Sequence, residues 1–329
     1  MKYKEGVISI MIPCYNGKEY ISRCFDAILN QTYKKIELIV VDDGSSDNSL
    51  EILNSYRDRF LQEGILYNVI HQENKGQAEA INSALKIASG EYITWQDIDD
   101  CYCNDSMESM KMYLDENGDI DFVRGKVDYI DNESGQLLWH GESKNPKGTK
   151  IFDSYVFQTD SYSFVGIFMA RMDFFDKCIK NRKIYPSRGG QNWQLILPMA
   201  YKGDCGYLDK VIYNQYVVKG SHSRTEYKNY ESEIDRQNTL LDILENVLND
   251  IGVYKEYQVK LEYKYNVKKY VIAYRYNKKK DMHVYLDNIN KVKKISFKEK
   301  VRLLYIPKYK NLIKRMPIIS NIYTRMRKR

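Results

Sequence analysis

The chain has 329 residues, of which 43% are hydrophobic and 29% charged, so it can bury a large core and is too apolar to be disordered. Its net charge of +7 hides an uneven distribution. Residues 260–329 hold 22 Lys and Arg against 4 Asp and Glu, which is +18 and leaves the rest of the chain at −11. This pattern indicates one large domain with an appendage, and an anionic partner for the basic end.

The six cysteines have no Cys-x-x-Cys spacing, which excludes the usual zinc motifs and favours reduced, buried thiols. The first residues lead directly into an apolar run and do not resemble a signal peptide. No apolar run reaches the length of a membrane span. We therefore expect a cytoplasmic protein.

Continuous apolar runs predict four strands near the start of the chain, because a strand buried on both faces has an unbroken hydrophobic sequence. Amphipathic segments lie between them and predict helices. Strands that alternate with helices favour an α/β fold with a mostly parallel sheet flanked by helices, in which ligands bind at the carboxyl ends of the strands. The strands are expected at residues 7–14, 36–43, 65–70 and 92–96, and the helices at residues 19–30, at residues 45–56 with Ser45 or Ser46 as the cap, and at residues 77–88.

The middle of the chain is less regular. Residues 121–130 predict a strand that bends near Gly125, and residues 137–140 predict its partner. A helix over residues 192–201 is expected to be interrupted by Pro198, which has no backbone N–H to donate. The remaining elements are an apolar segment at residues 164–170, a short helix from Met172 and a late strand at residues 211–218.

The hydrophobic period becomes helical at about residue 230 and stays helical. One helix has an apolar face over residues 240–248, and a second helix is expected at residues 255–276. We therefore predict a first domain over residues 1–225 and a helical, basic C-terminal extension over residues 226–329.

Three carboxylates directly follow the fourth predicted strand, namely Asp97, Asp99 and Asp100. Negative charges gathered at the mouth of a sheet are unfavourable unless a cation lies among them. Mg²⁺ or Mn²⁺ takes such oxygen ligands and keeps positions open for phosphate. The pattern predicts a metal site that holds a diphosphate; the alternative is a solvated acidic turn that caps a helix starting near Asn104.

The ends of the first two strands carry residues that suit a nucleoside. Tyr15 could stack on a base, and Asp42 or Asp43 could accept the imino hydrogen of a uracil-like ring. Because the carboxyl ends of parallel strands share one edge, these residues and the acidic triplet are expected to meet in one crevice. The alternatives are ordinary packing for Tyr15 and a simple strand-to-helix turn at residues 42–45.

Seven short motifs follow one another across about residues 7–102. They lie at residues 10–16, 31–33, 39–47, 74–77, 82, 90–93 and 97–100. Together they resemble the family-2 glycosyltransferases, and their order and spacing make the resemblance specific. The resemblance implies a GT-A fold, a nucleotide-sugar donor and a transfer that inverts the anomeric configuration.

The resemblance also implies roles for matching positions. Asp99 would be the principal ligand of Mg²⁺ or Mn²⁺, and Asp97 would lie near the ribose or the donor sugar, so both belong to the catalytic centre. Asp100 would face the acceptor. The other nucleotide-binding positions would be Pro13 and Tyr15 beside the base, Asp42 and Asp43 at the base and ribose, and Gly76 and Gln77 in a loop that approaches the nucleotide.

In the family the general base is usually the Asp of a Glu-Asp pair that opens a helix, and the matching pair here is Gln191-Asn192. An amide does not act as a general base near neutral pH. We expect these two residues to orient the acceptor while another carboxylate or water takes the proton, with Trp193 as a sugar-stacking platform or, alternatively, as core packing. Two further alternatives are a protein that binds donor and turns it over poorly, and a base supplied by Asp160, Asp173 or Asp204.

His222 follows the last predicted strand. In GT-A enzymes a His near the diphosphate commonly completes the metal shell, so His222 is expected as a second metal ligand and Arg224 as a phosphate contact. The alternative is an exposed loop histidine. His71 and His140 lack such a context and are expected to be structural or exposed.

The basic end of the chain has three interpretations. Nucleic-acid binding fits the charge, but no recognisable nucleic-acid module accompanies it. After Ser296, Lys and Arg alternate with apolar residues, and Pro307 and Pro317 divide the segment into short pieces. This pattern favours an anionic membrane surface over nucleic acid as the partner. A solvated helical bundle is the third interpretation.

The sequence thus predicts an inverting, metal-dependent glycosyltransferase at the inner face of the cell membrane. Its donor is expected to be a UDP-sugar, with guanosine or thymidine donors as alternatives. Its acceptor is expected to be a hydroxyl of a lipid-linked or growing surface polysaccharide such as a capsule or O-antigen. The alternative is a degenerate partner subunit that binds a nucleotide sugar without turnover.

Overall fold

The computed structural model of the chain describes residues 3–143, 145–159, 168–187, 189–218 and 229–292. The chain divides into two compact units, Met1–Lys219 and Gly220–Arg329. The expected domain boundary at residue 225 falls outside the described residues, so the exact limits stay a prediction.

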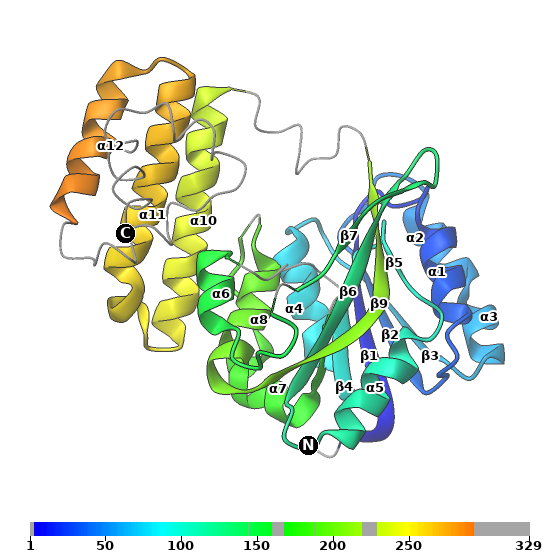
Figure 1. Ribbon diagram of the computed structural model, residues 1–329. Helices are drawn as coiled ribbons and strands as arrows, with labels where there is room; N and C mark the ends of the chain where they lie inside the picture. The colour runs from blue at the N-terminus through cyan, green and yellow to red at the C-terminus, as the bar shows by residue number, and fades with distance from the viewer. Residues whose placement is uncertain (1–2, 144, 160–167, 188, 219–228, 293–329) are drawn as a thin grey trace. The chain divides into compact units, whose positions relative to one another are not determined.

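Four parallel strands form the first half of the sheet (Figure 1). β1 (Lys4–Cys14) lies between β2 (Ile36–Asp42) and β4 (Gly90–Trp95), and β3 (Leu66–His71) lies beyond β2. The predicted strands and their parallel pairing are thus confirmed. The connecting helices are α1 (Ile21–Leu29), α2 (Ser49–Ser55), α3 (Arg57–Gln62) and α4 (Gln77–Ile87).

The second half of the sheet is mixed. β8 (Phe168–Arg171) runs antiparallel between β4 and β6 (Phe122–Asp131), and β9 (Cys205–Val217) runs parallel to β6. β5 (Cys101–Tyr102) pairs with β9, and β7 (Leu137–Gly141) pairs with β6, as predicted for residues 137–140. The expectation of a mostly parallel sheet therefore holds only for the first half. The helices here are α5 (Ser106–Glu116), α6 (Phe152–Phe157), α7 (Met172–Cys178), the 3₁₀ turn Lys180–Arg182 and α8 (Gln191–Lys202).

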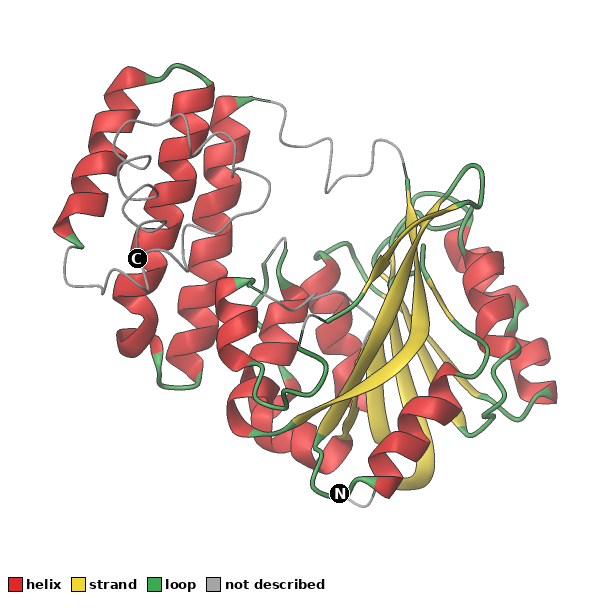
Figure 2. Cartoon of the chain, viewed as in Figure 1, coloured by secondary structure: helices red, strands yellow, loops and turns green. Residues whose placement is uncertain are grey.

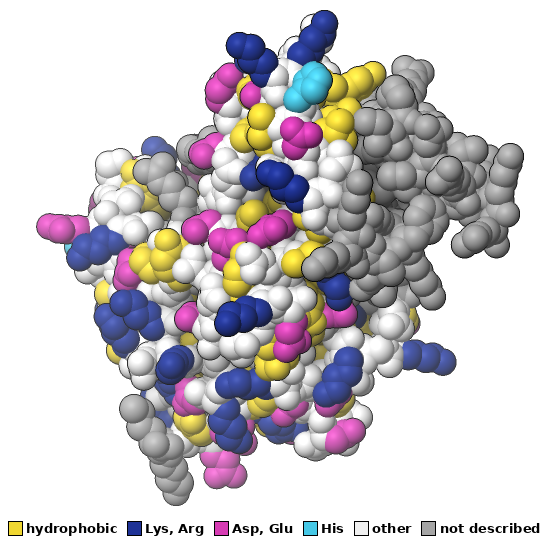
Figure 3. Space-filling model, turned by 90° about the vertical axis from the view of Figure 1, so that its left-hand side faces the viewer, with side chains coloured by type: hydrophobic (Ala, Val, Ile, Leu, Met, Phe, Trp, Pro, Cys, Tyr) yellow, Lys and Arg dark blue, Asp and Glu magenta, His cyan; other side chains and the backbone are white. Residues whose placement is uncertain are grey.

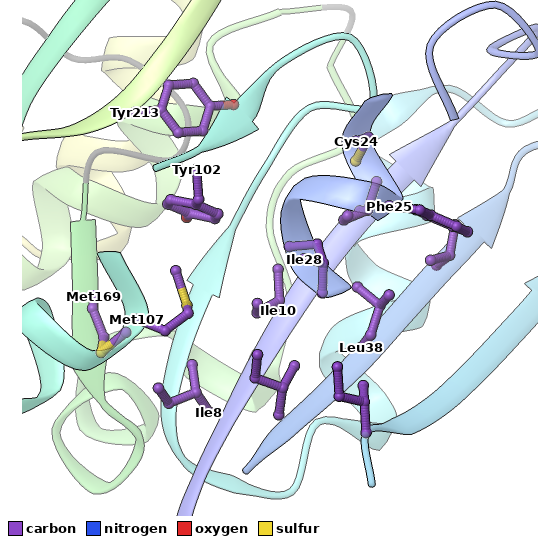
Figure 4. Packing of buried hydrophobic residues seen from close by; sticks show 14 of the residues in the cluster. Ile8, Ile10, Cys24, Phe25, Ile28, Leu38, Tyr102, Met107, Met169 and Tyr213 are labelled. Atoms are coloured by element: carbon purple, nitrogen blue, oxygen red, sulfur yellow. The ribbon is translucent and has the colours of Figure 1, made fainter. Parts of the chain in front are cut away.

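Helices cover both faces of this sheet. The helices α1 to α3 and α5 lie on one side, and α4, α6, α7 and α8 lie on the other (Figures 1 and 2). Figure 4 shows Phe25 and Ile28 of α1 facing Ile10 and Leu38 of the sheet, and all four side chains are fully buried. Burial on both faces explains why the central strands have continuous apolar sequences.

The expected cap at Ser45 or Ser46 is wrong. α2 begins at Ser49, whose backbone N–H donates to Asp47 Oδ1 over 3.0 Å. Ser46 instead donates its backbone N–H to Asn16 Oδ1 over 2.8 Å. Ser45 and Ser46 therefore connect the loop after β2 to the loop after β1. Rules for local helix capping do not predict this arrangement.

Two predicted irregularities have different outcomes. The register of β6 with β9 shifts between Gly125 and Val127, which confirms the bend near Gly125. α8 continues through Pro198, so the predicted interruption is wrong. Pro198 only removes one hydrogen-bond donor from the helix, and its neighbours Leu195 and Met199 are fully buried, so tertiary packing outweighs the loss.

The described part of the second unit is helical. It consists of α10 (Tyr230–Asp250), α11 (Tyr254–Arg275) and α12 (Lys279–Lys291). The first two helices confirm the prediction, whereas α12 is an addition to it; Met282 and Tyr285 of α12 are partly buried and pack against Tyr230, Ile272 and Ala273. None of the described helices has both the length and the apolarity of a membrane span.

The charge of the basic end falls mostly outside the described residues, since residues 293–329 hold 13 Lys and Arg and 1 Glu. The expected interfacial segment after Ser296 lies there too. On the face drawn in Figure 3, Lys and Arg side chains are interspersed with Asp and Glu rather than gathered in one patch. All six cysteines are free, and five of them are buried.

Gly44, just after β2, offers a test of the loop geometry. Its φ is +71°, and a Cβ there would lie 2.7 Å from the backbone N of Asn74. We expect Gly44→Ala to lower the free energy of unfolding by about 1–3 kcal/mol in urea denaturation, since both the conformation and the contact disfavour a side chain. The control is Gly118→Ala, because nothing lies within 4 Å of a Cβ there. Equal stability of the two variants would contradict the prediction.

Candidate functional site at the carboxyl ends of the strands

The acidic triplet gathers where the chain leaves β4. Asp97, Asp99 and Asp100 each offer a carboxylate oxygen, and these oxygens lie within 4.8 Å of one another. Asp100 is 3% exposed, whereas Asp97 and Asp99 are partly exposed. Among the described residues this is the one cluster of at least three His, Cys, Asp or Glu side chains with the spacing of a metal site.

The triplet is electrostatically strained. Burial raises the pKa of Asp97, and the charge of Asp99 raises it further. Burial also raises the pKa of Asp99, against a smaller opposite effect of Arg23. Burial and then the two neighbouring charges raise the pKa of Asp100 well above its ordinary value. A divalent cation would relieve this strain, and a set of carboxylate oxygens fits Mg²⁺ or Mn²⁺.

Asp100 does not fit the predicted acceptor contact. Its Oδ1 accepts a hydrogen bond of 2.8 Å from the backbone N of Tyr216, and its Oδ2 accepts one of 3.1 Å from the Tyr213 hydroxyl. Both oxygens are thus engaged by β9, and the residue is buried. Asp100 therefore anchors the acidic loop to β9, a long-range contact with no signal in the local sequence.

Arg23 of α1 also holds this loop, a contact for which the sequence contains no local signal. Its Nη2 donates to the backbone O of Asp99 over 2.7 Å, and its Nη1 donates to Asn132 Oδ1 over 2.8 Å. A second support is buried Gln96, which donates to the backbone O of Asp100 over 2.9 Å. Arg23 of α1 and Gln96 therefore both hold the acidic loop, which we define as residues 97–100.

Asp43 organises the loop between β3 and α4. Its Oδ1 accepts from Gln72 Nε2 over 2.7 Å and from Lys75 N over 3.0 Å, and its Oδ2 accepts from Gly76 N over 2.8 Å. Gln77, the next residue, donates from Nε2 to Asp97 Oδ1 over 2.8 Å. Asp43 and Asp97 are thus linked through the loop in which the resemblance placed Gly76 and Gln77.

Asp42 pairs with His71, which the sequence pattern does not mark as a site residue. Asp42 is fully buried, and its Oδ2 lies 2.7 Å from His71 Nδ1. Its Oδ1 is also buried and accepts no hydrogen bond from the described residues. His71 is the last residue of β3 and the register partner of Asp42. Because ligands bind at the carboxyl ends of parallel strands, this position alone predicts that His71 lies near the site.

Tyr15 stands at the end of β1 with 53% of its surface exposed. The following Asn16 has a φ of +50°, and its backbone N–H donates to Ser45 Oγ over 2.9 Å. The Tyr15 ring is therefore presented to solvent from a loop that the β2 end holds in place. Pro13, by contrast, is buried opposite Val41, and its contact with a base stays a prediction.

The proposed acceptor residues lie at the start of α8. Gln191 is 4% exposed and donates from Nε2 to the backbone O of Ser187 over 3.0 Å. Asn192 is more exposed. Trp193 is only 3% exposed, which fits core packing and corrects the expectation of a sugar-stacking platform.

Two of the alternative general bases, Asp173 and Asp204, lie at the edge of the sheet opposite to the acidic triplet. Asp204 immediately precedes β9, whereas Asp100 contacts Tyr216 near the opposite end of that strand, roughly 40 Å further along at about 3.3 Å per residue. Asp173 follows β8, where Arg171 N donates to the backbone O of Asp121, and Asp121 N donates to the backbone O of Asp204. Both are therefore excluded. Asp160, His222 and Arg224 lie outside the described residues.

Comparison with known sequences agrees with the fold and the motifs. The sequence model of Glycosyl transferase family 2 matches residues 9–179. Glycosyltransferase GlyG of Streptococcus pneumoniae is 40% identical over 135 residues, which are 41% of this chain and 43% of that protein. Poly(ribitol-phosphate) beta-glucosyltransferase of Bacillus spizizenii is 38% identical over 122 residues, which are 36% of this chain and 19% of that protein. The chain thus spans less than half the length of these relatives.

Solved structures share the architecture of nearly the whole chain. S. aureus TarS 1–349 in complex with UDP-GlcNAc has a TM-score of 0.56 at 19% identity, and the match covers 89% of this chain and 90% of that one. The mannosyltransferase PcManGT from Pyrobaculum calidifontis, in complex with GDP-Man and Mn²⁺, has a TM-score of 0.57 at 13% identity and covers 96% and 83%. At such identities the likeness shows the GT-A fold alone. The family match, however, covers more than half of the chain, and the chain belongs to glycosyltransferase family 2.

Proposed function

We propose that the chain is an inverting, metal-dependent glycosyltransferase that uses a nucleotide-sugar donor. The observation that carries the proposal is the hydrogen-bonded connection from Asp43 through Gly76 and Gln77 to Asp97. It connects Asp43, which we propose to lie at the nucleoside, with the carboxylate cluster that we propose to hold the metal. A nucleoside diphosphate has the same two parts, a base and a charged diphosphate.

The base would stack on the exposed ring of Tyr15. The position of Asp42 and Asp43 at the end of β2, next to the loop that carries Tyr15, supports a role for this pair at the base. The diphosphate would then lie toward Asp97 and Asp99. A UDP-sugar is the proposed donor, supported by the UDP-GlcNAc bound to TarS, while the GDP-Man bound to PcManGT keeps guanosine as the second choice.

The reaction forms a bond between an acceptor oxygen and the anomeric carbon. The bond from that carbon to the diphosphate oxygen breaks, and the nucleoside diphosphate leaves with the electron pair. The acceptor proton passes to a base. A cation held by Asp99 would offset the charge that develops on the leaving diphosphate. His222 remains our proposal for a second ligand.

Gln191 and Asn192 would orient the acceptor rather than deprotonate it, since amides are not bases near neutral pH. With Asp173 and Asp204 excluded, the proton would pass to water or to a carboxylate such as Asp160. Asn192 is the better candidate to contact the acceptor hydroxyl, because Gln191 is buried and donates to Ser187.

The proposed acceptor is a lipid-linked or growing surface polysaccharide. The poly(ribitol-phosphate) substrate in the name of one relative supports a surface polymer, although that alignment covers only 36% of this chain. The +18 charge of residues 260–329 supports attachment to the anionic inner face of a membrane, where each basic residue contributes about 1 kcal/mol.

A second candidate function is a nucleotide-sugar-binding partner that does not turn over its ligand. The amide pair at residues 191–192 favours it, because the usual carboxylates are missing at the position that matches the family motif.

Release of nucleoside diphosphate separates the two candidates. We expect the purified chain with Mn²⁺ to release UDP slowly from a UDP-sugar, and faster with a lipid-diphosphate saccharide. Asp99→Ala should reduce the rate about 100-fold or more, because it removes the principal metal ligand. Tight UDP binding without release under either condition would support the partner subunit. Undiminished release by Asp99→Ala would remove the metal from the mechanism.

Asp99→Asn should stabilise the metal-free protein while abolishing its response to metal. The raised pKa of Asp99 means that its ionised form destabilises the fold near neutral pH, so an uncharged amide should raise the melting temperature. Thermal unfolding with and without Mn²⁺ measures both effects. Asp119→Asn, at an exposed position, is the control and should change neither. A less stable Asp99→Asn protein would argue against electrostatic strain.

The stabilisation by Mn²⁺ should grow with pH. Because folding raises the pKa of all three carboxyls, the metal-free fold loses stability as pH rises from the ordinary Asp pKa of about 3.9 through the raised folded values. Protons also compete with the cation at low pH. The melting-temperature gain on adding Mn²⁺ should therefore be small near pH 5 and larger near pH 8, to be checked by calorimetry. A gain independent of pH would place the cation elsewhere.

A further inference from the structure

Arg23 joins three segments of the first unit behind the acidic triplet. Its Nη2 donates to the backbone O of Asp99 over 2.7 Å, and its Nη1 donates to Asn132 Oδ1, just beyond β6, over 2.8 Å. Its guanidinium carbon lies 3.6 Å from the ring centroid of Tyr216 on β9. A single side chain thus ties α1, the acidic loop and the second half of the sheet together.

The partners of Arg23 are electrically neutral. They are a carbonyl, an amide oxygen and aromatic rings, and within the described residues no carboxylate pairs with the guanidinium. Its positive charge is therefore not cancelled by an ion pair. It offsets part of the repulsion within the triplet without occupying any of the three carboxylates.

The hydrogen bond goes to the main chain of Asp99 and not to its side chain. A guanidinium bound to the carboxylate would compete with a cation for the same oxygens. Bound to the carbonyl, it fixes the backbone and leaves the carboxylate oxygens for the metal. We propose that Arg23 is a positioning residue that holds Asp99 in the orientation required for the cation, an inference that rests on the proposed metal-dependent function.

The support behind Arg23 is rigid. On α1, the flanking Cys24 and Phe25 are fully buried in the core, so the helix does not follow the loop. Arg, with its fixed fork of donors, holds two acceptors at once, which the ammonium of Lys does less well. The arrangement therefore depends on the guanidinium and not on positive charge alone.

Two roles for Arg23 predict opposite effects. If it were only a nearby positive charge, its removal would strengthen the binding of Mn²⁺ by reducing repulsion. If it positions Asp99, its removal weakens the binding, because the carboxylates are free to move apart. The sign of the change in Mn²⁺ affinity therefore distinguishes the two roles.

The experiment is a titration of the full chain with Mn²⁺, followed by electron paramagnetic resonance without nucleotide. We expect the dissociation constant of Mn²⁺ to rise about tenfold or more in Arg23→Ala, and by a smaller factor in Arg23→Lys. In turnover assays, high Mn²⁺ should restore much of kcat in Arg23→Lys, which a general loss of structure would not allow. Circular dichroism confirms folding, and Arg23→Lys carries the test if Arg23→Ala does not fold.

Arg59→Ala is the matched control. Arg59 also contacts α1, through an ion pair of 3.0 Å with Asp26, and its guanidinium carbon lies 4.8 Å from the ring centroid of Tyr56. It should bind Mn²⁺ like the wild type. Equal or tighter Mn²⁺ binding by folded Arg23 variants would overturn the positioning role alone. Absence of Mn²⁺ binding by the wild type would overturn both this role and the proposed metal-dependent function.

Discussion

The close approach of the Asp97, Asp99 and Asp100 carboxyls is the constraint on which the proposed site depends. Carboxylate oxygens within 4.8 Å of one another, partly shielded from water, would separate if the loop were free. The fold prevents this with contacts from separate elements: β9 holds Asp100, α4 holds Asp97 through Gln77, and α1 holds the backbone of Asp99. The loop is thus fixed before any ligand arrives, which lowers the cost of assembling a cation site.

The same contacts connect the two halves of the sheet. Gln77 and Asp43 belong to the parallel half, whose strands end at the residues proposed to contact the nucleoside. Tyr216 and Asn132 belong to the mixed half and reach the loop directly or through Arg23. A displacement of either half would therefore disturb the carboxylates. This coupling is a physical reason for the proposed donor site to lie across a sheet junction rather than on a single strand.

The sequence predicted well those features that depend on local pattern. The parallel strands, α4 and the strand-end location of Tyr15 and the triplet follow from continuous apolar runs and from the rule that ligands meet the carboxyl edge. The errors concern long-range geometry. Asp100 and Trp193 were assigned to the acceptor, but each is 3% exposed because of elements far away in sequence. Likewise, the antiparallel direction of β8 depends on strand pairing, and so does the sheet edge at which Asp204 lies. Arg23 is an ordinary residue of an amphipathic helix until α1 packs against the sheet.

The donor and acceptor sides of the proposed site differ in how much of the chemistry their residues can perform. On the donor side, stacking, hydrogen bonding and cation binding all have suitable groups in contact or connected by hydrogen bonds. On the acceptor side, each amide of Gln191 and Asn192 has one acceptor oxygen and an NH2 donor in place of the two acceptor oxygens of a carboxylate, and it lacks the basicity of a Glu-Asp pair. In the proposed mechanism, nucleotide binding is therefore independent of which group acts as the general base, whereas the rate of transfer depends on it. Asn192 is the position at which a restored Asp would test this distinction, because Gln191 is buried and donates to Ser187.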